Sequence, residues 1–157
     1  MGQINTREII LFNGTAASTS TGPDINVIQG WQAAIIVVNV TSITGTLDLY
    51  IQNKIGQPVT ADAPPGPPTG TGIYDDLCHF TQISATGTRV MRVLSMPNVP
   101  TANATTVTTA DYAIAQSSLA AGALRVGPIG GIWRAAYTIG TGPCTFSVTA
   151  QLIPFST

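Results

Sequence analysis

The sequence predicts an all-β protein, an antiparallel β-sandwich or jelly-roll-like barrel of seven to eight strands with long Pro/Gly loops. Three observations favour this fold class. Short apolar or alternating runs recur between turn residues, no strand–helix alternation is visible, and Gly, Pro, Asn and Ser cluster between the runs. The 157 residues suit a single domain over 1–157. Residues 1–24 are a possible N-terminal arm and loop.

The first half of the chain carries three expected strands before its longest loop. Residues 7–12 (REIILF) are a short β-prone run. Residues 31–40 (WQAAIIVVNV) are continuously apolar, which is typical of a strand buried on both faces. Residues 46–53 (TLDLYIQN) alternate between apolar and polar side chains, which indicates one buried face. The loop over 56–72 is so rich in Pro and Gly that neither a helix nor a central strand fits there.

The second half continues the pattern. Residues 73–84 and 88–96 are predicted as strands of a hairpin, because ATG separates them. Residues 110–124 are rich in Ala without a helical period, so they predict a short helix or an irregular strand. Residues 132–140 and 144–153 alternate on either side of GTGP and predict a C-terminal hairpin. The expected core comprises Ile35, Val37, Leu47, Leu49, Ile51, Phe146, Val148 and Leu152.

The chain is unusually poor in charge. Charged residues make up 8% of it and apolar residues 44%, whereas charged residues are about 25% of an average protein. Such a surface fits a protein whose faces are covered by copies of itself or by a partner, although a neutral Ser/Thr surface is the alternative. Net charge is −1, but residues 1–80 carry −4 and residues 81–157 carry +3. These charges could meet within one domain or between subunits.

His79, Cys78 and the adjacent aspartates of IYDDLCHFTQIS resemble a metal or hydrolytic site. On a strand, however, Asp75 and His79 would share one face while Asp76 and Cys78 share the other. His79 and Cys78 would then point apart, and the chain has no second histidine. We therefore expect His79 to be structural or on the surface, and we expect that its replacement by Ala leaves folding and assembly nearly intact. We expect no catalytic residue, no metal and no cofactor. Cys78 and Cys144 match no zinc spacing and are expected to be thiols, with a disulfide between them as the less favoured alternative.

Other function classes are disfavoured by what the chain lacks. Six basic residues and a net charge near zero do not favour nucleic-acid binding. No apolar stretch approaches the roughly 18 residues of a membrane span, and no signal peptide is visible. We therefore expect no nucleic-acid partner, no membrane, and synthesis in a host cytoplasm.

Two segments carry a resemblance to a known family. HFTQISATGTRVMRVLSMP and WRAAYTIGTGPCTFSVTAQLIP, with the apolar strand over 31–40, resemble small β-rich virion proteins of tailed bacteriophages, some of which are head decoration or cement proteins. Residues 98–131 are longer than the family's pattern. The positions that carry the resemblance are Phe80, Thr81, Gln82, Gly87, Thr88, Arg89, Arg92, Pro97, Trp133, Arg134, Phe146, Ser147 and Val148.

The resemblance implies a jelly-roll-like fold, self-association that is often trimeric, and binding to the major capsid protein on the virion surface, with no catalysis. Contacts are expected from an N-terminal arm and from the proline loop. Their residues would be Ile4, Arg7, Ile9, Ile10, Leu11, Pro64, Pro65, Pro67 and Pro68. A strand in residues 7–12 that pairs within its own sandwich is the alternative to the arm. A tail-associated or host-glycan-binding module is the alternative function, with Tyr50 and Tyr74 as candidate aromatic contacts.

Overall fold

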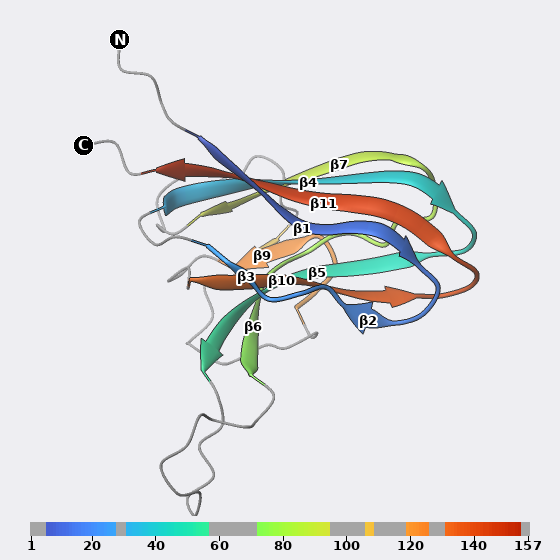
Figure 1. Ribbon diagram of the computed structural model, residues 1–157, viewed down its shortest axis with the longest axis horizontal. Helices are drawn as coiled ribbons and strands as arrows, with labels where there is room; N and C mark the ends of the chain where they lie inside the picture. Colours follow the sequence, from blue (N-terminus) through green and yellow to red (C-terminus); the bar gives the residue numbers. More distant parts are fainter. Residues whose placement is uncertain are drawn as a thin grey trace, which may run out of the picture.

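The computed structural model describes residues 6–27, 31–56, 72–94, 106–108, 119–125 and 131–154, and these form two packed sheets (Figure 1). The four-stranded sheet has the order β1-β11-β4-β7, and the seven-stranded sheet has the order β2-β10-β5-β6-β9-β8 with β3 also paired to β10. The strands are β1 (Arg7–Ala16), β2 (Ser20–Thr21), β3 (Ile25–Asn26), β4 (Trp31–Ile43), β5 (Leu47–Gly56), β6 (Ile73–His79), β7 (Gly87–Leu94), β8 (Thr106–Thr108), β9 (Ala123–Arg125), β10 (Ile132–Ile139) and β11 (Cys144–Pro154).

The all-β sandwich is confirmed, and its connectivity is that of a jelly roll. In chain order, β1, the short pair β2 and β3, β4 and β5 alternate between the two sheets. β6 stays beside β5, and β7, β10 and β11 alternate again. This order gives two interlocked Greek keys. The described residues hold eleven strand segments rather than seven to eight, because β2, β3, β8 and β9 are only two or three residues long.

Both predicted hairpins are wrong. β6 belongs to the seven-stranded sheet and β7 to the four-stranded one, and β10 and β11 are divided in the same way. The turns between them carry the chain from one sheet to the other rather than back along a paired strand. The predicted alternation of β10 and β11 agrees with their burial, but alternation does not reveal which strand becomes the neighbour.

The β4–β5 turn and the β10–β11 turn are hydrogen-bonded to each other at one end of the sandwich. The Gly140 amide donates to the Thr46 carbonyl at 2.9 Å, and the Thr44 amide donates to the Pro143 carbonyl at 3.3 Å. Gly45 has a φ of +100°, and a side chain there would lie 2.3 Å from the Thr141 carbonyl oxygen. A residue with a Cβ would therefore be both strained and in collision, which explains the glycine.

The core lies between the sheets and is built from alternate residues of the long strands. Leu47, Leu49 and Ile51 of β5 are fully buried, and Phe146, Val148 and Leu152 of β11 are within 1% of full burial. These six expected core residues are confirmed.

Phe12 stacks on Phe146 with ring centroids 4.4 Å apart. The register of β11 against β1 and β4 thus places aromatic contacts inside the sandwich.

The other two expected core residues are wrong. Ile35 and Val37 are half-buried on the outer face of β4, whereas Ala34, Ile36 and Val38 are fully buried on its inner face. The continuous apolar run was interpreted as a strand with two buried faces, but the described fold covers only one. The apolar outer face of β4 therefore needs another explanation.

The segment over 110–124 is described only from residue 119 onward. There it forms a turn and then β9, which pairs with β6 through Leu124 and Cys78. The helix-or-strand prediction for residues 110–118 lies outside the described residues. The expected loop contacts Pro64, Pro65, Pro67 and Pro68, and Ile4 of the expected arm, also lie outside them.

The expected N-terminal arm is corrected where it can be seen. β1 pairs along its length with β11 of its own sandwich. Ile9 is 6% exposed and Leu11 fully buried in the core, so neither is free to contact a partner. Arg7 and Ile10 remain on the surface. The alternative stated from the sequence, a strand that pairs internally, is what the structure has for residues 7–16.

Candidate functional site

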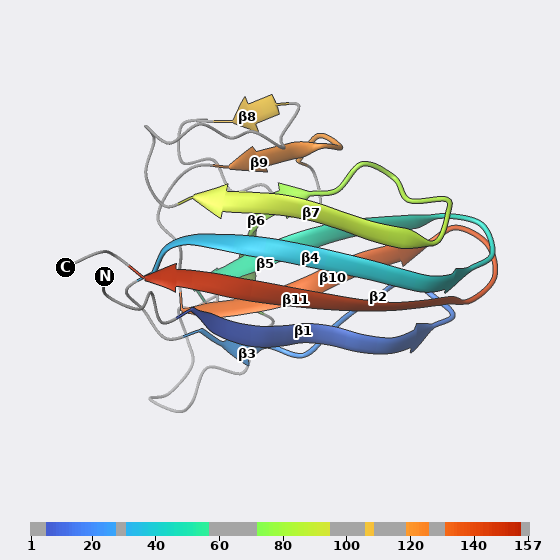
Figure 2. The same cartoon turned by 90° about the horizontal axis from the view of Figure 1, so that it is seen from above.

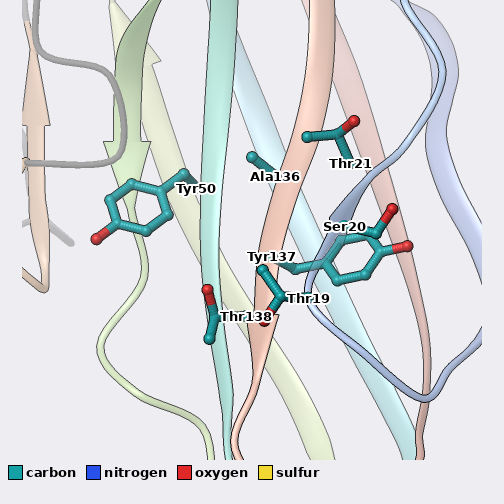
Figure 3. A pocket seen from close by; sticks show the side chains of 7 residues that line it. All are labelled: Thr19, Ser20, Thr21, Tyr50, Ala136, Tyr137 and Thr138. Atoms are coloured by element: carbon teal, nitrogen blue, oxygen red, sulfur yellow. The ribbon is translucent and has the colours of Figure 1, made fainter.

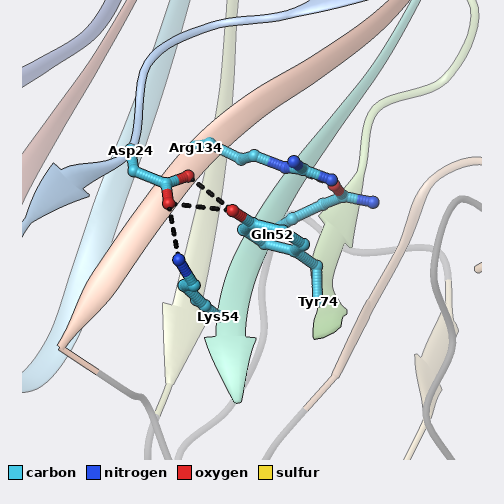
Figure 4. A network of polar contacts seen from close by, with 5 residues as sticks. All are labelled: Asp24, Gln52, Lys54, Tyr74 and Arg134. Carbon is cyan, nitrogen blue, oxygen red and sulfur yellow. Dashed lines mark hydrogen bonds and ion pairs between the residues drawn. The ribbon is translucent and has the colours of Figure 1, made fainter. Parts of the chain in front are cut away.

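The outer face of the seven-stranded sheet carries a network of polar side chains around Tyr74 (Figure 4). The Lys54 ammonium and the Tyr74 hydroxyl both donate to the Asp24 carboxylate, at 3.1 and 2.8 Å. The hydrogen bond to Asp24 raises the pKa of Lys54. Burial, followed by the same carboxylate, raises the pKa of Tyr74. Asp24 thus joins the loop after β2 to strands β5 and β6.

A second group of contacts leads from Arg134 into the sheet. The Arg134 guanidinium lies 3.2 Å from the centroid of the Tyr74 ring, and its Nε donates to Gln52 Oε1 at 2.9 Å. Gln52 Nε2 in turn donates to Asp76 Oδ1 at 2.8 Å. Gln52 and Asp76 are fully buried. A buried carboxylate is costly unless it is hydrogen-bonded, and here the amide of Gln52 connects it to a cation.

The second oxygen of Asp76 holds the segment that precedes β9. The Leu119 amide donates to Asp76 Oδ2 at 3.0 Å, and the Gly122 amide donates to the His79 carbonyl at 2.8 Å. Leu119 itself is 6% exposed. Asp76 therefore stabilises a loop at the edge of β6, and its charge is used inside the fold.

His79 is held between the same segment and β5. Its Nδ1 lies 2.6 Å from the Leu119 carbonyl oxygen, and its Nε2 lies 2.5 Å from Asp48 Oδ1. The Tyr50 ring stacks on the imidazole with centroids 3.8 Å apart and planes at 16°. A carbonyl and a carboxylate only accept hydrogen bonds, so each ring nitrogen of His79 faces an acceptor from another part of the fold. His79 is structural in this arrangement.

The sequence-based face assignment around His79 is partly wrong. Asp76 pairs with Gln52 and Cys78 pairs with Ile51, so a bulge makes Leu77 an extra residue on β6. Leu77 and Cys78 both turn into the core, while Asp76 and His79 share the outer face. His79 and Cys78 do point apart, as predicted, but Asp76 rather than Asp75 lies on the histidine side. Bulges shift alternation by one residue, which no periodicity shows.

Both cysteines are buried thiols, as predicted. Burial raises the pKa of the Cys78 thiol well above its usual range, and burial also raises that of Cys144. A raised pKa leaves little thiolate, which is the reactive form. No group of three or more His, Cys, Asp or Glu side chains within the described residues could hold a metal ion. The described part of the chain also has no helix long and apolar enough to cross a membrane.

A cavity of about 290 Å³ opens beside the polar network, between β2, β10 and β5 (Figure 3). Its lining is hydroxyl-rich and carries no charge: Thr19, Ser20, Thr21, Tyr50, Ala136, Tyr137 and Thr138. Hydroxyls can donate and accept, so such a lining suits a neutral polyhydroxylated ligand. In Figure 3, however, the Tyr50 ring extends from β5 away from β2. His79 covers one of its faces.

The outer face of the four-stranded sheet has a different character, and no described segment crosses it (Figure 2). The strand registers align its side chains in rows across all four strands. The charged row contains Glu8, Gln151, Ile35 and Arg92. The apolar row beside it contains Ile10, Thr149, Val37 and Val90. The amide–hydroxyl row contains Asn13, Ser147, Asn39 and Thr88.

This docking face, defined by the three rows, exposes apolar side chains and very little charge. Ile10 is 56% exposed and Val90 is 44% exposed, and these are two of the three large apolar side chains noted as exposed among the described residues. Only Glu8 and Arg92 are charged within the rows, at the two edges of the sheet. Sequence analysis missed this surface, although the continuous apolar run of β4 was its signal.

Comparisons of the chain with protein-family models, with curated proteins and with solved structures each find no match. The resemblance to phage virion proteins therefore has no support beyond the residues that suggested it. What the chain does has to be argued from its two unlike outer faces.

Proposed function

We propose that this chain is a structural virion protein that binds and stabilises a phage capsid as a decoration protein, without catalysis. The observation that carries the proposal is the docking face. It is four strands wide, nearly uncharged and open along its apolar row. A face with so little charge, with Ile10 and Val90 exposed in one row, is suited to contact with another protein surface, either a second copy of this chain or a partner.

The buried polar side chains support the same proposal, because their contacts are structural. Gln52 donates to Asp76, and Asp76 and His79 each contact the backbone of Leu119, so these side chains stabilise the sandwich. Many copies on a lattice can hold a shell through individually weak contacts, since avidity replaces single-site affinity. Jelly rolls occur in viral structural proteins and also in lectins, so the fold is compatible with the proposal and does not decide it.

Binding to capsid shells tests the proposal directly. Shells assembled from the major capsid protein encoded with this chain are incubated with increasing amounts of the purified protein and sedimented. We expect saturable co-sedimentation at a fixed ratio and added density on the shell by electron microscopy. We also expect the shell to resist a higher temperature when decorated. Absence of binding at concentrations well above those of the shell subunits would contradict the proposal.

The N-terminal contribution needs a shorter deletion than residues 1–12, because β1 supplies Ile9 and Leu11 to the core. Removal of residues 2–6 leaves β1 intact. Reduced shell binding by a folded variant would assign the capsid contact to the arm. Unchanged binding would leave two loops as the candidates from the sequence: residues 56–72, which include Pro64, Pro65, Pro67 and Pro68, and residues 97–131.

The alternative function, a tail-associated or glycan-binding module, is favoured only by the hydroxyl-lined cavity. Tyr50 and Tyr74 are poor stacking platforms, because His79 occupies one face of the Tyr50 ring and Tyr74 is only 4% exposed, with Arg134 over its ring. Saturation-transfer NMR with neutral oligosaccharides would detect such binding. Binding that is lost when Thr138 is replaced by Val, with no capsid binding, would favour this alternative.

A further inference from the structure

We propose that two copies of this chain pack through their docking faces around a two-fold axis parallel to the strands. The inference deepens the proposed function and rests on its premise that the chain works through protein contacts. It assigns the docking face to self-association and specifies the symmetry, so in the dimer the capsid contact falls to the N-terminal residues and the loops. The argument uses the strand registers, the positions of the two charges and the exposure of the apolar row.

The charges of the docking face are placed for self-complementarity. Glu8 lies on β1 and Arg92 on β7, at opposite edges of the sheet but in the same row. Three strand spacings separate them by about 14 Å, too far for a contact within one chain. A two-fold axis along the strands, between β11 and β4, brings β1 of one copy over β7 of the other. Glu8 then faces Arg92 of the second copy, and the same pair forms twice.

The same rotation matches the uncharged positions. Ile10 comes to lie over Val90 of the second copy, and Thr149 over Val37. In the third row Asn13 faces Thr88, and Ser147 faces Asn39. An axis across the strands would instead set each edge strand against itself and leave Glu8 and Arg92 without opposite charges. Only the axis along the strands pairs both charges, and so the registers select this arrangement.

Pairing also accounts for the sequence of β4. Its inner residues Ala34, Ile36 and Val38 are covered by the other sheet, but Ile35 and Val37 are equally apolar and only half-buried. A strand that is apolar on both sides is typical of burial on both sides. A second copy supplies the missing cover. It also removes Ile10 and Val90 from water.

The size of the docking face sets the expected strength. Four strands at about 4.8 Å and eight residues at about 3.3 Å give about 500 Å² per copy. The pair would bury about 1,000 Å², which is near the lower limit for a specific interface. We therefore expect a concentration-dependent monomer–dimer equilibrium rather than an obligate dimer. Dimers could then be reinforced when many copies are held on one lattice.

Sedimentation velocity over a concentration series, with the full chain and no capsid present, tests the association itself. We expect a reversible shift from monomer to dimer. A chain that stays monomeric to about millimolar concentration, or that forms trimers, would overturn the proposal, because this face meets only one partner under two-fold symmetry.

Charge reversal tests the arrangement. Glu8→Arg and Arg92→Glu should each weaken dimerisation by about tenfold or more, because each places like charges together at two positions. The double variant Glu8→Arg/Arg92→Glu should recover the wild-type affinity to within about threefold, since opposite charges face each other again. Arg89→Glu is the matched control. Arg89 lies on the same strand but pairs with Val38, outside the three rows, so dimerisation should be unchanged.

Each outcome separates this inference from the proposed function. Dimerisation that is insensitive to both single reversals, or a double variant without recovery, would overturn the two-fold arrangement while leaving capsid binding to its own assay. Capsid binding that fails although the charge swap behaves as expected would overturn the proposed function and keep the dimer. Thermal unfolding of every variant verifies that the monomer fold is intact.

Discussion

The contacts of His79 show how a residue that suggested chemistry came to stabilise the fold. The imidazole connects Asp48 on β5 to the Leu119 carbonyl and stacks on Tyr50. From the sequence alone we expected that its replacement would leave folding nearly intact. The structure changes that expectation, because the side chain is only 5% exposed and both its nitrogens are engaged.

His79→Ala should lower the free energy of unfolding by about 1–3 kcal/mol, since it leaves the buried Leu119 carbonyl without its partner. Urea denaturation measures the change, and hydrogen exchange should show faster opening of residues 119–125. Tyr50→Phe keeps the stacked ring and should stay within about 0.5 kcal/mol of wild type. Equal stability of His79→Ala and wild type would show that the contacts of His79 with Asp48 and Leu119 contribute nothing to the free energy of unfolding.

Strand β4 is informative because two consecutive isoleucines, Ile35 and Ile36, point to opposite faces of the sheet. Ile36 is fully buried between the sheets, and Ile35 is half-buried on the docking face. The cost of truncating a core side chain includes the cavity left behind, whereas a surface position can relax. The two positions therefore report which face of the strand the monomer buries.

Ile36→Ala should destabilise the monomer by about 2–5 kcal/mol. Ile35→Ala should cost less than about 1 kcal/mol at concentrations below dimerisation. Both values come from denaturant unfolding of dilute protein. Similar costs for the two variants would indicate that β4 is shifted in register, or that something else already covers the docking face in the monomer.

In the whole molecule, the two outer faces differ in how their charged side chains are used. The seven-stranded sheet engages charged side chains internally: Asp24 pairs with Lys54, Asp48 contacts His79, and Gln52 connects Arg134 to Asp76. The docking face has one charge at each edge and apolar side chains between them. The charge difference between the two halves of the sequence matches this arrangement, because Glu8 belongs to the acidic half and Arg92 to the basic half.

Ionic strength should therefore weaken self-association without abolishing it. Raising sodium chloride from about 0.01 M to 1 M shortens the Debye length from about 30 Å to about 3 Å. The dimer dissociation constant should rise several-fold, and the apolar row should maintain a measurable dimer. Sedimentation equilibrium gives both constants. The variant Glu8→Gln/Arg92→Gln serves as the control and should have lost this dependence. Tighter association of the wild type at high salt would contradict the two ion pairs.

Local patterns in the amino-acid sequence were enough to predict the class of the fold and most of its long strands. Period-two alternation placed β5, β10 and β11, and Pro and Gly excluded regular structure over 56–72, because these signals are local. The sequence also separated His79 from Cys78 and favoured free thiols. The low charge pointed to covered surfaces, although it did not indicate which surface.

The pairing partners of these strands could not be predicted, because they depend on contacts between distant parts of the chain. The sheet to which each strand belongs, the bulge at Leu77 and the inward face of β4 all depend on residues far away in the sequence. Alternation is the same whichever face is buried, and one inserted residue exchanges the faces. For the same reason Glu8 and Arg92, 84 positions apart in the printed sequence, became members of one row only when β11 and β4 paired between them.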